Sequence, residues 1–418
     1  MNTKRTLKIG IFTDTYSPQI NGIVTSVVTL KAELERRGHT VYVFTAKDPA
    51  SQKQARVYRL PSLPFVFEPQ LRAAYVYPPR LLYKIRKLEL DIVHTHTEFS
   101  VGVLGKLVAE FIGKPYIHTY HTKYEDYAHY IINGRIVRKI ARQFSSFFCN
   151  RADVVVAPVA STRDSLVSYG VSRTIEVVPT GLDFRPFVEA VEEERLREEL
   201  GIPQDARVVL FVGRVAKEKS IDVLIQAMPK LLECVPEAVL VVIGNGPIIG
   251  QLTGLADELG VARAVKFLGG RPHSSIPRYY KLGDVFATAS TSETQGLTYY
   301  EAMASGLVVV AKKDGSNDGV LVDGENSYVF QEDQELPQVL AKALLEEAGH
   351  IRARAMETIR PLSSEIFGQA MEEIYFRAMG DAKKGSRGRI WSGIADKRRY
   401  IEKIYNKLGD IKLPGTKN

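Results

Sequence analysis

One stretch in the second half of the chain limits its fold more than any other. Two apolar runs, at 284–289 and 307–311, have the length of buried strands and enclose a polar loop followed by a helix-forming segment. Glu293 lies in the loop and Glu301 in the helical segment. Loops of this kind lie at the carboxyl edge of a parallel sheet, where open α/β proteins bind ligands. The stretch therefore predicts a binding edge, although Glu293 could also cap the helix and Glu301 could pair with a cation.

The same order of buried strand, polar loop and helix recurs along the chain and predicts two α/β domains. The loop at Asn21-Gly22 follows the first strand, the loop 213–220 follows the strand that opens the second domain, and Gly244-Asn245-Gly246 follows another strand. Asn21-Gly22 can also be read as a plain strand–helix turn. We expect the following division: a first domain at 1–182, a loose charged linker at 183–204, a second domain at 205–378 and a basic tail at 379–418 that could pack back on the first domain.

Charge is distributed unevenly over these segments. Residues 1–182 hold 25 Lys and Arg against 14 Asp and Glu, residues 183–381 hold 20 against 31, and residues 382–418 hold 11 against 3, within an overall net charge of +8. A basic first domain and tail indicate an anionic partner, either a membrane surface or a nucleic acid. We find no duplex-reading helix or base-stacking motif, and the second domain is acidic, so a nucleic-acid-binding protein is the weaker alternative.

Two motifs together resemble a known enzyme family. One is Glu293-x7-Glu301 with Gly296 inside it and Glu-Ala-Met-Ala-Ser-Gly closing it, and the other is Gly-Arg-x4-Lys at 213–219. The chain resembles the retaining nucleotide-sugar glycosyltransferases of family 4. The resemblance implies a GT-B architecture, α/β in class, in which two doubly wound Rossmann-like domains face each other across a cleft that holds a nucleotide-sugar donor.

Residue roles follow from that resemblance alone. Arg214 and Lys219 would hold the donor phosphates, Glu301 the ribose, and Glu293 with the amides of the next residues the sugar, while His121 would lie beside the reaction centre. The catalytic candidates are thus His121, Arg214, Lys219 and Glu293. The sequence departs from the usual Phe-Gly of the family at Gln295-Gly296. The donor-binding candidates are Gly22, Arg214, Lys219, Gly244, Asn245, Gly246, Arg271, Glu293, Thr294, Gln295, Gly296, Leu297 and Glu301.

The segment 118–130 resembles the branch of the family that glucosylates diacylglycerol in Gram-positive membranes. It implies transfer of glucose from UDP-glucose to 1,2-diacylglycerol, giving 3-O-α-glucosyl-diacylglycerol for glycolipid and lipoteichoic-acid anchor synthesis. Other acceptors remain open: a monoglycosylated, inositol or polyprenyl lipid, or a soluble molecule. A non-catalytic subunit is a further alternative, but such a chain would usually lose His121, Lys219 or Glu301.

Two predicted helices, at 79–88 and 133–148, combine an apolar stripe with a basic one, as helices at a bilayer surface do. An aromatic loop precedes the first of them. Most amphipathic helices simply cover their own sheet, which is the alternative here. The candidate membrane and acceptor residues are Phe65, Phe67, Arg80, Lys84, Lys87, Tyr124, Arg135, Arg138, Lys139 and Arg142.

Other sequence features indicate which cofactors and which cellular location to expect. The sequence has no Asp-x-Asp pair, so we expect no obligatory metal, with stimulation by Mg²⁺ left open; His94 and His96 share a strand face, but no cysteine supports a zinc site. Cys149 and Cys234 follow no motif and are expected to be reduced. With no signal peptide and no apolar run of roughly 20 residues, we expect a peripheral protein on the cytoplasmic face of the membrane.

Overall fold

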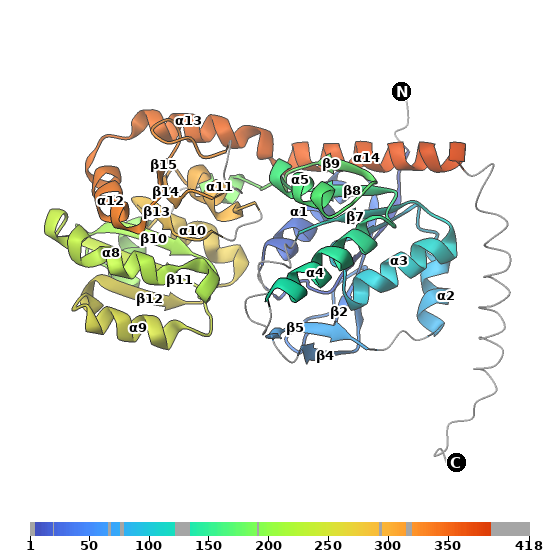
Figure 1. Ribbon diagram of the computed structural model, residues 1–418, viewed down its shortest axis with the longest axis horizontal. Helices are drawn as coiled ribbons and strands as arrows, with labels where there is room; N and C mark the ends of the chain where they lie inside the picture. Colours follow the sequence, from blue (N-terminus) through green and yellow to red (C-terminus); the bar gives the residue numbers. More distant parts are fainter. Residues whose placement is uncertain are drawn as a thin grey trace, which may run out of the picture.

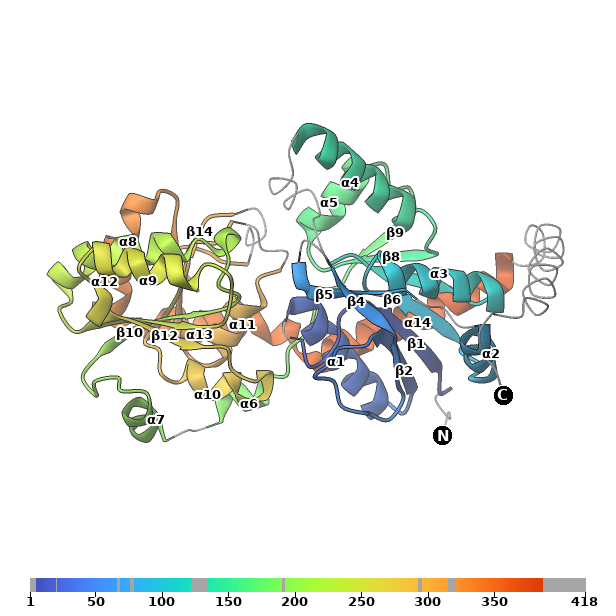
Figure 2. The same cartoon turned by 90° about the horizontal axis from the view of Figure 1, so that it is seen from below.

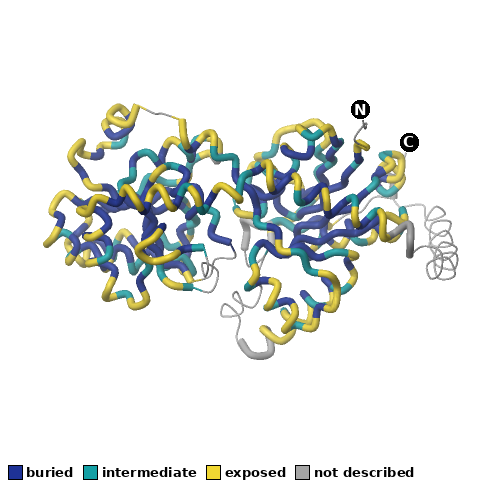
Figure 3. Tube along the Cα trace, turned by 90° about the horizontal axis from the view of Figure 1, so that it is seen from above, coloured by how far each residue is buried: buried dark blue, intermediate teal, exposed yellow. Residues whose placement is uncertain are grey.

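The computed structural model describes residues 5–385, apart from 20, 66–67, 76–78, 122–133, 190–191, 292–294 and 315–319. Two α/β domains lie side by side, and one long helix runs from the second domain along the first (Figure 1). Buried residues follow the strands of both sheets, whereas exposed residues follow the outer faces of the helices (Figure 3). The predicted architecture of two doubly wound parallel-sheet domains is confirmed.

The first domain is built on a parallel seven-stranded sheet in the order β3-β2-β1-β6-β7-β8-β9. Apolar runs form its central strands because both faces of such a sheet are covered by helices. The strands are β1 (Lys8–Thr13), β2 (Thr40–Ala46), β3 (Val57–Leu60), β6 (Ile92–Thr95), β7 (Tyr116–Thr119), β8 (Val154–Ala157) and β9 (Thr174–Val177). The helices are α1 (Gly22–Arg36), α2 (Pro79–Lys87), α3 (Ser100–Ile112), α4 (Gly134–Cys149) and α5 (Ala160–Ser168).

The second domain repeats this plan on a six-stranded sheet in the order β12-β11-β10-β13-β14-β15. Its strands are β10 (Arg207–Val212), β11 (Ala238–Ile243), β12 (Val265–Gly269), β13 (Val285–Thr288), β14 (Val308–Lys312) and β15 (Tyr328–Phe330). Its helices are α8 (Ile221–Cys234), α9 (Ile249–Glu258), α10 (Ile276–Tyr280), α11 (Leu297–Ala304), α12 (Leu336–Leu345) and α13 (Gly349–Ile359). In both sheets the strand order reverses beside the first strand, so the loops after β1 and β10 lie at switch points where ligands bind.

The last described helix, α14 (Ser364–Gly385), completes the first domain instead of the second. Its Phe367, Met371 and Tyr375 are buried in the same hydrophobic core as residues of α1 and β1. The carboxylate of Glu372 accepts hydrogen bonds from Arg37 at 2.6 Å and lies 3.0 Å from Nε2 of His39. The chain thus leaves the first domain, builds the second and returns. Residues 379–385 of the predicted tail continue this helix, and the rest of the tail lies outside the described residues.

The stretch 183–204 differs from the loose linker that its charge predicted. It contains two short helices, α6 (Arg185–Val188) and α7 (Glu193–Glu199). Phe187, Leu196 and Ile202 pack into the core of the second domain. Three apolar residues spaced through a highly charged stretch are enough to anchor it.

The aromatic segment before α2 is a hairpin of β4 (Ser62–Phe65) and β5 (Glu68–Ala74), not a loop.

Among the helices that the structure describes, none has both the length and the apolar composition needed to cross a bilayer.

Candidate active site

Helix α11 carries the second carboxylate of the Glu-x7-Glu motif into a buried position. Gly296 precedes the helix with a φ of 67°, and a Cβ atom there would lie 2.3 Å from the Tyr299 ring, so the turn requires glycine. Glu301 is 6% exposed, and its Oε2 accepts a 2.7 Å hydrogen bond from the hydroxyl of Tyr280. Burial raises the pKa of Glu301 to about 7, and the Tyr280 hydrogen bond opposes that rise.

The loop that leads into α11 is fastened to the connection between the domains. The amide of Gln295 donates from Nε2 to the carbonyl of Thr180 at 3.0 Å and accepts from the Thr180 N–H at 2.9 Å. The Thr180 hydroxyl in turn donates to Ser26 of α1 at 3.2 Å. A Cβ atom on Gly22 would lie 4.0 Å from Leu297 Cδ1. The N-terminal ends of α1 and α11, from different domains, therefore meet.

Arg214 and Lys219 lie in the loop after β10, as the sequence predicts. Arg214 forms a short ion pair with Glu218, whose side chain is only 8% exposed. Lys219 ends a turn of 3-10 helix, η2 (Lys217–Lys219), and its N–H donates to Ala216 at 2.9 Å. A guanidinium and an ammonium carried by one loop can neutralise a diphosphate.

The glycine turn after β11 packs directly against that cationic loop. A Cβ atom on Gly244 would lie 1.8 Å from the Gly213 carbonyl, and one on Gly246 would lie 1.9 Å from the Val215 carbonyl. Asn245 links the turn to the next loop by accepting from Gly270 N–H at 2.9 Å. Nearby, the Arg271 guanidinium lies 5.3 Å above the Tyr279 ring, which orients it. These contacts align three loops at one sheet edge.

Four histidines lie at the carboxyl ends of β6 and β7. His94 contacts the Tyr375 hydroxyl at 2.8 Å and the Thr119 hydroxyl at 2.7 Å. His118 contacts Glu98 at 3.2 Å, and Nδ1 of His96 lies 2.9 Å from Nε2 of His121. Burial lowers the pKa of His121 to about 3 and holds the pKa values of His94 and His96 well below their usual range. His121 is therefore a neutral imidazole near pH 7.

No group of three or more His, Cys, Asp or Glu side chains among the described residues is arranged to hold a metal ion. The histidines His94 and His96, which share a strand face as predicted, instead contact hydroxyl groups and His121.

Several predicted site residues fall outside this description. Glu293, Thr294, Phe67 and Tyr124 are not among the described residues, and for three others, Phe65, Arg80 and Arg135, only the backbone is described. Their predicted roles stay predictions.

The two amphipathic helices have different surroundings. In α2, Leu81 and Ile85 are 8% and 1% exposed and pack into the core of the first domain, so of the two alternatives for this helix the structure shows the one in which the apolar stripe faces inward. Its Lys84 and Lys87 remain exposed. The reason is that α2 covers its own sheet, the commoner use of an amphipathic helix.

Helix α4, in contrast, exposes its apolar face. Ile140, Phe144 and Phe147 are 59%, 37% and 56% exposed, whereas Phe148 and Cys149 at the end of the helix are buried. The Phe144 ring stacks with that of Phe99, just before α3, at 6.4 Å between centroids, and Val103 and Leu107 of α3 are also exposed. Arg138, Lys139 and Arg142 are exposed on the same helix. Figure 2 shows α4 projecting from the body of the first domain.

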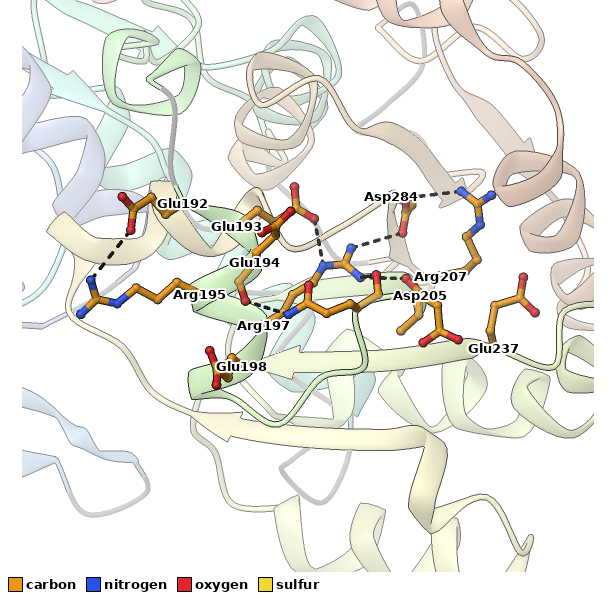
Figure 4. Close-up of a pocket in the computed structure, with 12 residues that line it drawn as sticks. Glu192, Glu193, Glu194, Arg195, Arg197, Glu198, Asp205, Arg207, Glu237 and Asp284 are labelled. Atoms are coloured by element: carbon orange, nitrogen blue, oxygen red, sulfur yellow. Dashed lines mark hydrogen bonds and ion pairs between the residues drawn. The ribbon is translucent and has the colours of Figure 1, made fainter.

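A charged pocket lies in the second domain, away from these groups (Figure 4). At its centre Arg197 is 6% exposed and donates to the carbonyls of Ala206 and Leu282 and to Glu193. Asp284 and Arg207 lie at the amino ends of β13 and β10, so the pocket is at the edge opposite the binding loops. Arg197 holds α7 against the sheet.

Sequence reasoning missed four partners of the site residues: Tyr280 beside Glu301, Thr180 beside Gln295, Glu218 beside Arg214 and His96 beside His121. Two left a signal. Glu218 follows Arg214 by four positions, a spacing that brings side chains together within one helical turn, and His96 follows His94 on one strand face. Tyr280 and Thr180 left none, because 21 and 115 residues separate them from their partners.

Two parallel-sheet domains with a cationic loop and a buried carboxylate at the facing edges define a glycosyltransferase of GT-B architecture. The model of "Glycosyltransferase Family 4" matches residues 20–185, and that of "Glycosyl transferases group 1" matches residues 192–359. The chain belongs to the family 4 glycosyltransferases and is a hexosyltransferase enzyme.

Its relatives include two proteins named alpha-monoglucosyldiacylglycerol synthase. The one from Streptococcus pneumoniae is 36% identical and covers 89% of this chain and 86% of its own length. The one from Acholeplasma laidlawii is 33% identical, and the match covers 88% of this chain and 96% of the relative's own length. Among solved structures, Anabaena HepE in complex with UDP and glucose is 20% identical to this chain. The match covers 88% of this chain and 99% of the HepE chain, and its TM-score of 0.73 shows a shared fold.

Proposed function

We propose that this glycosyltransferase transfers glucose from UDP-glucose to 1,2-diacylglycerol at an anionic membrane surface, with retention of configuration, and forms 3-O-α-glucosyl-diacylglycerol. The observation that carries the acceptor is the similarity over 89% of the chain to a protein named alpha-monoglucosyldiacylglycerol synthase. The donor is supported by the UDP and glucose of the HepE structure, which has the same fold.

The exposed face of α4 supports the membrane part of the proposal. Three large apolar side chains, Ile140, Phe144 and Phe147, face outward beside basic residues, which is the composition of a helix lying in a bilayer interface. Near an anionic surface each basic residue contributes about 1 kcal/mol, so a few of them give reversible attachment. A peripheral location on the cytoplasmic membrane face follows from the proposal.

The proposed reaction replaces one bond at the anomeric carbon by another. The bond between the anomeric carbon and the leaving phosphate oxygen breaks, while the acceptor hydroxyl bonds to that carbon on the same face. The acceptor proton moves to the leaving phosphate, whose charge Arg214 and Lys219 neutralise. Neutral His121 donates a hydrogen bond to the sugar, and ionised Glu301 accepts from the ribose hydroxyls. No step in this scheme requires a metal, and Mg²⁺ could still stimulate the reaction.

The proposal is tested by incubating the purified full chain with radiolabelled UDP-glucose and liposomes containing diacylglycerol, with and without anionic phospholipid. We expect labelled glucosyl-diacylglycerol, in greater amount with the anionic lipid, and an α-glycosidic linkage by NMR. Absence of a lipid product in every liposome would contradict the acceptor, and a β-linkage would contradict retention.

Parallel reactions examine other acceptors. A protein from Corynebacterium jeikeium named D-inositol 3-phosphate glycosyltransferase is 29% identical over 73% of this chain, so inositol phosphate belongs in the series together with an inositol lipid and monoglucosyl-diacylglycerol. Faster transfer to any of these than to diacylglycerol would replace the proposed acceptor. GDP-mannose replaces the donor in a further reaction, because a 28% identical relative is named as GDP-mannose-dependent.

A further inference from the structure

The pair His96 and His121 has a hydrogen-bond pattern that restricts the state of both rings. His96 is 1% exposed, and its backbone N–H donates to the carbonyl of Phe12 in β1 at 2.9 Å. Its Nδ1 lies 2.9 Å from Nε2 of His121, and the two rings are nearly parallel, at 18°. Both rings are neutral, since burial disfavours their charged forms by lowering each pKa. One of these two nitrogens therefore carries the proton of the hydrogen bond and donates it, and the other nitrogen is bare and accepts it.

The remaining nitrogen of His96 decides which ring supplies that proton. A neutral imidazole has one protonated nitrogen, which donates, and one bare nitrogen, which accepts. Nε2 of His96 is buried and has no hydrogen-bond partner among the described residues. If His121 donated to His96, this nitrogen would have to be an orphaned buried N–H, and such donors are rarer in proteins than acceptors left unpaired. If His96 instead donates from Nδ1 to His121, Nε2 of His96 carries no proton and is only an acceptor left unpaired.

We propose that His96 is a positioning residue for His121: its Nδ1–H donates to Nε2 of His121 and holds that ring in the tautomer whose proton is on Nδ1. His121 then presents a donor, not an acceptor, from its other nitrogen. The role of this donor toward a sugar oxygen rests on the function proposed above. A donor in this place orients the donor sugar and stabilises negative charge as the glycosidic bond breaks.

The surrounding contacts keep His96 in place. The ring of His94 lies 4.1 Å from that of His96, and His94 is fixed between Tyr375 of α14 and Thr119 of β7. His96 cannot turn away without disturbing this packed row of rings. The arrangement is therefore preformed before any substrate binds, which is what a positioning role requires.

Three variants at one position separate the proposal from a purely structural role. Asn in place of His96 offers an N–H where Nδ1 stood, Asp has the same shape but accepts only, and Leu offers neither. We expect His96→Asn to keep kcat within a few-fold. We expect His96→Asp and His96→Leu to lower kcat by roughly 10- to 100-fold, the usual scale for removing the group that orients a functional histidine. The donor KM should stay nearly constant in all three.

The outcomes are decisive in both directions. Equal kcat values in all three variants would overturn the proposal, as would a His96→Asn enzyme as slow as His96→Leu. A fast His96→Asp enzyme beside a slow His96→Asn enzyme would assign the opposite tautomer. Thermal unfolding of each variant identifies any that fails to fold.

A second measurement needs no substrate. In the full chain labelled with ¹⁵N-histidine, NMR distinguishes protonated from bare ring nitrogens, and the His121 signals are those that vanish in His121→Asn. We expect a protonated Nδ1 and a bare Nε2, and the reverse would contradict the proposal. Because this result does not depend on transfer, it stands even if the wild-type chain makes no glucosyl-diacylglycerol, an outcome that would count against the proposed function alone.

Discussion

At the scale of single residues, the proposed contact of Glu301 with the donor ribose would make donor binding depend on the ionisation of this carboxyl group. Its carboxylate is buried, and its pKa is raised to about 7. The ionised form accepts hydrogen bonds from ribose hydroxyls more strongly than the protonated form, in which one oxygen carries a proton, and the ionised form is lost as the pH falls through this value. Donor affinity should therefore decrease on the acid side of neutrality.

We predict that the donor KM of the wild-type chain rises as the pH is lowered from 8 to 6, by up to about tenfold per pH unit below the pKa. Glu301→Gln should bind donor weakly but with a flat profile. Tyr280→Phe removes the hydrogen bond that lowers the Glu301 pKa, so its profile should shift to higher pH. The measurement is donor KM against pH for the three chains, and a flat wild-type profile would contradict the role of Glu301.

A substitution of Lys219 tests the proposed mechanism most directly. Its ammonium would stabilise charge that develops on the leaving phosphate, so Lys219→Ala should reduce kcat by about 100-fold or more. Lys217 is two positions away in the same turn and is exposed, so Lys217→Ala is the matched control and should stay near wild type. Near-wild-type turnover of Lys219→Ala would remove this residue from the mechanism.

At the scale of elements, the sequence predicted strands better than it predicted the use of helices. The apolar runs expected at 284–289 and 307–311 became β13 and β14, which begin within one residue of the expected starts, because a strand covered on both faces has a continuous apolar pattern. The patterns of α2 and α4 are both amphipathic and basic. What buries one and exposes the other is the presence of neighbouring elements, and a periodic pattern does not encode that.

The candidate site shows the same limit. The motif residues Arg214, Lys219 and Glu301 could be found because their spacing is local. The contact between Gln295 and Thr180 could not, because it joins a loop of one domain to the connection between both. Long-range pairs of this kind depend on the completed packing.

Helix α4 supplies a prediction of its own. Transfer of a Phe side chain into apolar surroundings is worth about 2 kcal/mol, and partial insertion less, so Phe144→Ser with Phe147→Ser should weaken vesicle binding roughly 100-fold. Leu345→Ser, at a residue 59% exposed on α12 of the second domain, is the control. Co-sedimentation with anionic liposomes measures both. Unchanged binding of the double variant would exclude α4 from the membrane contact.

At the scale of the whole molecule, α14 joins the two domains through a buried carboxylate. Glu372 is 2% exposed and lies against Arg37 and His39 of the first domain. We predict that Glu372→Ala destabilises the first domain by about 3 kcal/mol, because Arg37 would keep its charge in a largely buried place without its partner. Glu373→Ala, at the exposed neighbour, should change stability by less than about 0.5 kcal/mol. Thermal unfolding compares them, and equal melting temperatures would show that the pair contributes nothing.

The return of α14 also has a consequence for synthesis of the chain. A ribosome completes the strands of the first sheet early, yet Phe367, Met371 and Tyr375 complete the first domain's core only when most of the chain has been made. Until then one face of that sheet is covered by α1 without α14, while the second domain has all of its own strands and can fold ahead of it. The domain translated first is thus expected to be the last to reach its native packing, and nascent chains halted before residue 364 should expose that face to chaperones.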